Sequence, residues 1–287
     1  ELTLSLACAR LRNKPVKEPR MRITIEDKSY YVGTGGKPFD SELPTVVFLH
    51  GTGMDHRAWA LQTRWFAFHG YNVLAPDFPG HSLSEGKCPE SIEDSAVWLE
   101  QMLDHLKVAA AHIVGHSQGF LSALEFAANS PKRVILLVGV GTAAAIPVNP
   151  ALIKTAYESA FDAAKMMLQW GFGPNIHLGV SPTPGMQPLG QGLQIMGLNP
   201  IATDLEACAA YTGGAAATVK VSQLEATIPT AMILAGKDKM TPIKSGYAAA
   251  TTLNAKVVVI ENAGHMLHIE APREVLDALR GFITEIT

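Results

Sequence analysis

The chain has 287 residues, of which 47% are hydrophobic and 17% are charged, and its formal net charge is −3. This composition excludes an intrinsically disordered chain and suffices for one large domain or for a core with an inserted lid. A small negative charge without a basic stripe argues against a nucleic-acid partner. The longest apolar stretch, Val134–Val148, is shorter than the ~20 apolar residues of a membrane helix, so we expect no membrane association.

Cysteine spacing and the first twenty residues point to a cytoplasmic protein. Cys8, Cys88 and Cys208 are too few and too scattered for a disulfide framework. No CxxC or His-x-x-His spacing suggests a metal site, so we expect no metal and no cofactor. Residues 1–20 begin with an uncharged apolar run after Glu1 and turn basic at Arg10, so they lack the basic n-region that opens a signal peptide. We expect them to form an N-terminal extension, with Met21 as a candidate natural start.

Short apolar runs alternate with helical periodicity along the chain. Residues Ile23–Val32 favour an early antiparallel strand pair, and Val-, Ile- and Leu-rich runs predict further strands buried on both faces. These runs are Thr45–Leu49, Asn72–Ala75, His112–Val114, Val134–Val138, Thr230–Ala235 and Lys256–Ile260. Amphipathic segments at Ile92–Leu106 and Pro272–Phe282 predict helices between and after them. This alternation predicts an α/β fold with a parallel sheet and helices on both faces.

The alternation stops between about Ala144 and Ala226. Residues Ala151–Leu168 predict one helix and Leu205–Tyr211 a shorter one, while Gly171–Pro200 is too rich in Gly and Pro for long regular elements. A loop of this length inside a compact domain is usually functional or disordered. We therefore expect a core of residues 21–143 and 227–287, with residues 144–226 inserted over the sheet as a lid.

The segment Gly115-His116-Ser117-Gln118-Gly119 predicts a nucleophile. It follows the strand at His112–Val114 and precedes a helical pattern, so Ser117 would occupy a tight, strained strand-to-helix turn. Such a turn projects the hydroxyl from the sheet at the positive end of the helix. A second match, Gly80-His81-Ser82, follows Pro79 instead of a buried strand, so we interpret Ser82 as a loop serine.

A second motif predicts an oxyanion site. The strand Thr45–Leu49 opens into His50-Gly51-Thr52-Gly53, a loop type that can aim a backbone N–H at a substrate oxygen. We assign the first donor to the N–H of Thr52, with Gly53 as the alternative. The second donor would be the N–H of Gln118. The simpler interpretation of this loop is an ordinary glycine turn.

Two loops that follow later strands supply a candidate acid and base. Asp238 lies just past Thr230–Ala235, and His265 lies just past Lys256–Ile260, which is where open α/β sheets place their sites. A neutral imidazole can take the serine proton, and a carboxylate can orient the ring. A solvated charge cluster is the alternative interpretation of Asp238 between its two lysines, and His268 is a rival for the base.

These motifs, together with Asp77-Phe78-Pro79-Gly80-His81-Ser82, resemble the α/β-hydrolase superfamily over about Ile23 to Phe282. The resemblance is strongest to its esterase, lactonase and carbon–carbon-bond hydrolase branch. It implies an eight-stranded, mostly parallel sheet with a lid after the sixth strand. Ser82 and Phe120 depart from the family pattern, which usually has glycine at both positions. Haloalkane dehalogenases and epoxide hydrolases of this superfamily carry Asp where this chain has Ser117.

We expect a serine hydrolase that cleaves a small or medium uncharged ester or lactone through an acyl-enzyme. The lid segment contains no arginine that could clamp a carboxylate or phosphate, and it is rich in Met, Leu, Trp and Phe. The alternatives are a carbon–carbon-bond hydrolase, a cofactor-free perhydrolase and a non-catalytic ligand-binding module. Both a monomer and a homodimer fit the sequence.

Overall fold

A computed structural model describes residues 21–174 and 188–286, apart from the side chains of residues 188 and 189. The predicted extension at residues 1–20 and part of the Gly- and Pro-rich segment therefore lie outside the described residues. No helix in the described part of the chain is long and apolar enough to cross a membrane.

Eight strands form one sheet in the order β1-β2-β4-β3-β5-β6-β7-β8. Their bounds are Met21–Ile25 (β1), Lys28–Gly33 (β2), Thr45–Leu49 (β3), Asn72–Pro76 (β4), Ala111–His116 (β5), Val134–Val140 (β6), Thr230–Ala235 (β7) and Lys256–Ile260 (β8). Strands β1 and β2 pair antiparallel, β2 pairs antiparallel with β4, and all other pairs are parallel. The predicted eight-stranded, mostly parallel α/β-hydrolase sheet is confirmed.

Alternating side chains of the central strands enter two separate cores, one on each face of the sheet. On β3, Val46 and Phe48 belong to one core, whereas Val47 and Leu49 belong to the other. This division follows from the two-residue repeat of a strand, and it explains why the central strands are apolar throughout.

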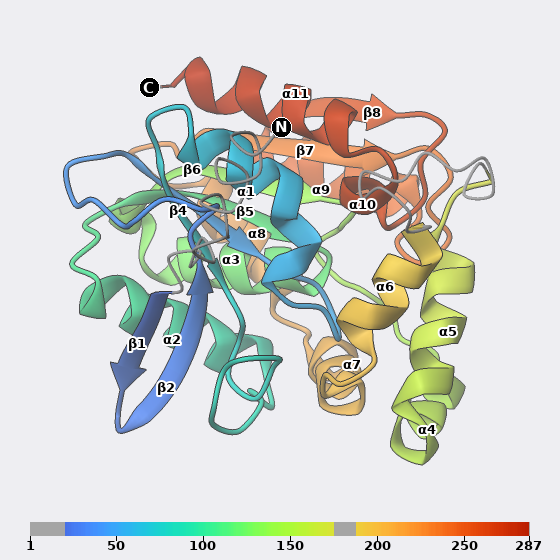
Figure 1. The fold of residues 1–287 in the computed structure, drawn as a ribbon. Coiled ribbons are helices and arrows are strands. Elements are labelled where there is room, and N and C mark those ends of the chain that lie inside the picture. Colours follow the sequence, from blue (N-terminus) through green and yellow to red (C-terminus); the bar gives the residue numbers. More distant parts are fainter. Residues whose placement is uncertain (1–20, 175–187, 287) are drawn as a thin grey trace, which may run out of the picture.

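Helices cover both faces of the sheet (Figure 1). The helices of the core are α1 (Ala60–Ala67), α2 (Ile92–His105), α3 (Gln118–Asn129), α9 (Ile243–Leu253), α10 (Leu267–Glu270) and α11 (Pro272–Thr284). Helices α1 and α11 pack on the Phe48 side, and α2, α3 and α9 pack on the Leu49 side. The predicted helices at Ile92–Leu106 and Pro272–Phe282 are confirmed.

The insertion between β6 and β7 carries helices α4 (Pro150–Glu158), α5 (Ala160–Gly171), α6 (Pro188–Met196), α7 (Ile201–Ala210) and α8 (Gly214–Ser222). Figure 1 shows α4 to α7 grouped at one end of the sheet, whereas α8 packs against α3 and α9. The limits of the lid, residues 144–226, stay a prediction.

The prediction of a single helix over Ala151–Leu168 is wrong, because the helix is interrupted at Ser159. This residue is extended, with φ −157° and ψ 102°, and its hydroxyl accepts the N–H of Asp162 as the cap of α5. Helix α7 also begins four residues before the predicted start at Leu205.

Candidate active site

Ser117 lies at the sharp turn between β5 and α3. Its backbone is left-handed, with φ 51° and ψ −119°, a conformation that non-glycine residues rarely adopt outside strained functional turns. The glycines on either side let the turn close. A Cβ on Gly115 would lie 2.5 Å from the Cα of Phe120, and a Cβ on Gly119 would lie 2.5 Å from the carbonyl oxygen of His50.

A continuous hydrogen-bond chain joins three side chains from three separate loops. Nε2 of His265 lies 2.9 Å from Oγ of Ser117, and Nδ1 of His265 lies 2.9 Å from Oδ2 of Asp238. The other carboxylate oxygen of Asp238 accepts the N–H groups of Met240 and Thr241 at 2.9 and 2.7 Å. The side chains of His265 and Asp238 are each 2% exposed. The structure therefore brings together the three residues predicted to act together, and their catalytic roles stay predictions.

The two predicted oxyanion donors flank the serine from separate elements. Thr52 lies in the loop after β3, and its hydroxyl donates to Oε1 of Gln118 at 2.9 Å. Among the described residues, the backbone N–H groups of Thr52 and Gln118 have no hydrogen-bond acceptor. The N–H of Gly53, the alternative donor, is already donated to Oδ2 of Asp204 at 2.7 Å. This geometry favours Thr52 over Gly53 as the first donor.

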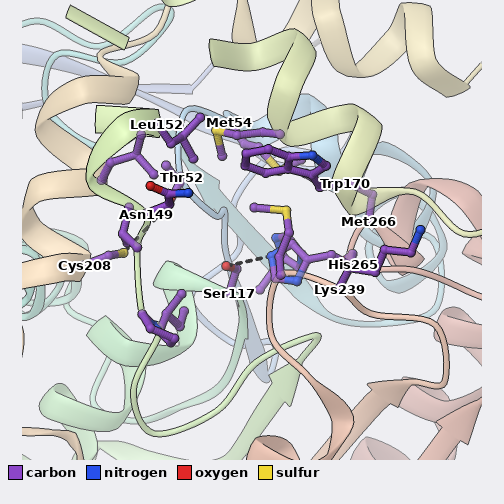
Figure 2. A pocket seen from close by; sticks show the side chains of 17 residues that line it. Thr52, Met54, Ser117, Asn149, Leu152, Trp170, Cys208, Lys239, His265 and Met266 are labelled. Carbon is purple, nitrogen blue, oxygen red and sulfur yellow. Dashed lines mark hydrogen bonds between the residues drawn. The ribbon is translucent and has the colours of Figure 1, made fainter. Parts of the chain in front are cut away.

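The serine opens into a cavity of about 190 Å³ between the core and the insertion (Figure 2). Its wall is mostly apolar, and the insertion contributes much of it: Ile146, Pro147, Val148, Leu152, Met167, Trp170 and Leu205. Figure 2 shows Met54 and Leu152 on the side of the cavity opposite Ser117. Asn149 and Lys239, both exposed, add polar side chains to its lining.

Two further histidines lie near the serine without contacting its hydroxyl. Burial, followed by the neighbouring His265, lowers the pKa of His268 to about 3, and burial also holds the pKa of His116 well below its ordinary value. Nε2 of His116 contacts the carbonyl oxygen of His265 at 2.9 Å. Neither ring nitrogen of His268 has a partner in the described structure. His268, the rival for the base, therefore does not contact Ser117.

Cys208 adds a thiol to the wall of the cavity. Its Sγ lies 3.8 Å from Oγ1 of Thr52. Burial and the nearby charge of Asp204 raise the pKa of Cys208 to about 12. The side chain is therefore a neutral thiol near pH 7 and does not compete with Ser117 as a nucleophile.

In the part of the chain that the structure describes, two groups of side chains are close enough to share a metal ion. They are His81, Cys88 and Asp204, and Asp55, His56 and Asp77, and within each group the potential ligand atoms lie within 4.8 Å of one another. Each group is also joined by hydrogen bonds or ion pairs. His81 pairs with Asp204, Cys88 donates to Asp204, His56 pairs with Asp77, and Asp55 binds Arg57.

Sequence reasoning missed Asp204, Asn199 and Glu270. Asp204 and Asn199 hold the loop after β3 through Gly53, and Glu270 accepts the N–H of Gly264 at 2.6 Å, directly before His265. Gly53, which both residues bind, lies 151 positions from Asp204 and 146 positions from Asn199. Glu270 had a local signal, because a carboxylate that follows a glycine loop by six residues can reach back to its N–H groups.

The chain belongs to the alpha/beta hydrolase family, whose model matches residues 46–278. It is 40% identical over 113 residues to a 2-hydroxy-6-oxononadienedioate/2-hydroxy-6-oxononatrienedioate hydrolase of Pseudomonas putida, and this match covers 37% of the chain and 40% of that relative. The match thus spans less than half the length of that curated protein.

Solved structures with the same fold include two hydrolases of different stated activity. The enol-lactonase from Burkholderia xenovorans LB400 superimposes with a TM-score of 0.80 at 21% identity, covering 92% of this chain and all of that chain. A thermophilic esterase from Thermogutta terrifontis has a TM-score of 0.73 at 22% identity, covering 93% and 98%. At these identities the likeness establishes the fold alone.

Proposed function

We propose that the protein is a serine hydrolase that cleaves a small or medium uncharged carboxylic ester or lactone through an acyl-enzyme. The observation that carries the proposal is the hydrogen-bond chain from Ser117 through His265 to Asp238, which ends at an apolar cavity. A hydroxyl that contacts a buried imidazole, itself held by a carboxylate, is the arrangement that makes serine nucleophilic.

In the proposed reaction, Oγ of Ser117 attacks the substrate carbonyl carbon while Nε2 of His265 takes its proton. Asp238 holds the ring through Nδ1 and stabilises the imidazolium that forms. The carbonyl oxygen gains negative charge and accepts hydrogen bonds from the N–H groups of Thr52 and Gln118. His265 then protonates the leaving alcohol. Water, activated by the same imidazole, cleaves the acyl-enzyme and restores the serine.

The volume and lining of the cavity support the proposed substrate class. A volume of about 190 Å³ admits a short or medium acyl group, and the Met, Leu, Ile and Trp side chains of the wall favour an apolar one. No arginine lies between Arg133 and Arg273, so the insertion offers no bidentate partner for a carboxylate or phosphate. These features support a neutral ester or lactone.

A panel of p-nitrophenyl esters of graded chain length tests the proposal. We expect the wild type to hydrolyse the butyrate faster than an acyl-coenzyme A, and Ser117→Ala to lose this activity. Ser82→Ala is the matched control, because Ser82 lies in the second Gly-His-Ser sequence but on an exposed turn. Full turnover by Ser117→Ala, or a marked loss in Ser82→Ala alone, would overturn the assignment.

Carbon–carbon-bond hydrolysis is the second candidate, and one observation favours it. Lys239 lies at the margin of the cavity and is exposed, so a carboxylate of an anionic dienoate could pair with it there. The relative from Pseudomonas putida is named for such a substrate. Comparing a 2-hydroxy-6-oxo-dienoate with the neutral esters decides between the two. A higher kcat/KM for the dienoate that is lost in Lys239→Met would establish the second candidate.

A further inference from the structure

One buried carboxylate of the insertion contacts both segments that carry the predicted oxyanion donors. Asp204 lies on α7 and is 3% exposed. Its Oδ2 accepts the backbone N–H of Gly53 at 2.7 Å, and its Oδ1 accepts Nε2 of Gln118 at 3.2 Å. Gly53 follows Thr52, and Gln118 follows Ser117. Helix α7 is thereby tied to the loop after β3 and to the first turn of α3.

The side chain of Gln118 extends this connection to Thr52. Its Oε1 accepts the hydroxyl of Thr52 at 2.9 Å, while its Nε2 donates to Asp204. Both polar ends of the amide are therefore used, and its orientation is fixed by its neighbours. The result is a buried chain from Asp204 through Gln118 to Thr52, which joins the two residues assigned as oxyanion donors.

Asn199 of the insertion holds the same loop from its carbonyl side. Its Nδ2 donates to the carbonyl oxygens of Gly53 and Met54, both at 2.9 Å, and its Oδ1 accepts the N–H of Ser82 at 2.8 Å. Gly53 has a left-handed backbone, with φ 67°. The N–H of Gly53 is thus bound by Asp204 and its carbonyl oxygen by Asn199, both from the insertion. The conformation of the loop after β3 therefore depends on these two contacts.

His81 balances the charge of Asp204. Its Nε2 lies 3.0 Å from Oδ2 of Asp204, and both side chains are buried. Burial is the largest single effect and opposes the charged form of each residue, but the opposite charge and the hydrogen bonds together outweigh it. The pKa of His81 is therefore raised and the pKa of Asp204 is lowered. An unpaired buried carboxylate would repel a developing oxyanion. The ion pair lets Asp204 hold the donors without placing a net negative charge beside them.

We infer that Asp204 is a positioning residue for the oxyanion hole. Through the side chain of Asp204, helix α7 fixes the positions of the backbone N–H groups of Thr52 and Gln118. The inference rests on the proposed ester or lactone hydrolysis. It makes the insertion more than a wall of the cavity, because the hole is complete only while α7 contacts the loop after β3. The competing explanation is a buried ion pair that stabilises the fold and has no particular effect on the oxyanion.

Asp204→Asn separates these explanations when two ligands with the same alkyl chain are compared. An alkyl trifluoromethyl ketone is attacked by Ser117, whose proton passes to His265, and its carbonyl oxygen becomes an oxyanion. The matching alcohol fills the cavity without forming a bond. We expect Asp204→Asn to raise the Ki of the ketone by roughly 10- to 100-fold, to lower kcat by a similar factor and to leave the Ki of the alcohol and KM within about threefold.

Two further variants complete the experiment. Asp162→Asn removes an exposed carboxylate of the same insertion, and it should bind both ligands as the wild type does. Gln118→Met removes the side-chain link but keeps the backbone N–H, so we expect it to reproduce the selective loss for the ketone. If Asp204→Asn does not fold, Gln118→Met still distinguishes a role in positioning the oxyanion donors from a purely structural role.

Equal weakening of ketone and alcohol, or no weakening of either in Asp204→Asn and Gln118→Met, would overturn the inference while ester hydrolysis by the wild type still stands. A wild-type protein that neither hydrolyses the esters nor binds the ketone more tightly than the alcohol would instead refute the proposed function, and the inference with it.

Discussion

Nδ1 of His265 lies 2.9 Å from Oδ2 of Asp238, and this contact holds the ring with Nε2 directed at Ser117. Oδ1 of Asp238 is held in turn by the N–H groups of Met240 and Thr241. The orientation of the imidazole is therefore fixed from the side remote from the serine. A base held in this way loses little entropy when it takes the proton.

Asp238→Asn should lower kcat by about 10⁴-fold, because an amide at this position favours the wrong tautomer of His265. The fold should persist, since the Asn oxygen can still accept from Met240 and Thr241. Steady-state kinetics and circular dichroism measure the two effects. Glu261→Gln is the control, because Glu261 is an exposed carboxylate in the loop that leads to His265. A mild loss in Asp238→Asn, equal to that of the control, would remove Asp238 from the mechanism.

Gly119→Ala should destabilise the protein by at least about 1–3 kcal/mol, because the added methyl group would overlap the backbone where β3 meets α3. Its Cβ would lie 2.5 Å from the oxygen of His50 and 2.6 Å from that of Leu49. Gly281→Ala is the matched control. Apart from its chain neighbours and the nearby backbone of α11, no atom lies within 4 Å of its added Cβ. The free energy of unfolding should therefore rise by up to about 1 kcal/mol. Urea unfolding of both variants measures the difference, and equal stabilities would contradict the close packing of the turn.

The stabilisation from the His81–Asp204 pair should depend on pH. The pKa of His81 is raised in the folded protein. The contribution of His81 to the free energy of unfolding is therefore complete below its ordinary pKa of about 6.5 and is lost as the pH rises through the raised value. The pKa of Asp204 is lowered, so its contribution fades only in acid, as the pH falls through that lowered value. The difference in free energy of unfolding between wild type and His81→Gln should therefore shrink from pH 6 towards alkaline pH. A constant difference would show that His81 is not charged.

Leu152→Trp should shift the substrate preference towards shorter acyl chains, because Leu152 is part of the cavity wall. We expect kcat/KM for p-nitrophenyl octanoate to fall by at least roughly 10-fold, with the acetate little changed. Leu198→Trp makes the same substitution on the insertion at a residue that is 96% exposed, and it should leave both values unchanged. An unaltered chain-length profile in Leu152→Trp would mean that the acyl group binds elsewhere.

The fold and the proximity of Ser117, Asp238 and His265 were predictable because their signals are local. Val46 to Leu49 are apolar without alternation, which indicates a strand buried on both faces, and Asp238 and His265 each follow such a strand. The break in the first lid helix also had a local signal, since Ser159 and Asp162 form a capping pattern. The apolar periodicity on both sides of Ser159 nevertheless favours one continuous helix.

The role of Asp204 could not be predicted from the sequence. It shares a helix of mostly small and apolar residues with a second carboxylate, Glu206. Its partners His81 and Gly53 lie 123 and 151 positions away. Nothing in its neighbourhood along the chain distinguishes it from a solvated surface residue. Its burial, and its contact with two other segments of the site, arise only when the insertion folds over the end of the sheet.

Peptide mass spectrometry of an acid-quenched reaction tests the central claim most directly. Mixed with a p-nitrophenyl ester and quenched within the first turnovers, the protein should carry the acyl group on the peptide that contains Ser117. Ser117→Ala should carry none. An acyl group on another residue, or hydrolysis at the wild-type rate without any adduct on Ser117, would contradict the account.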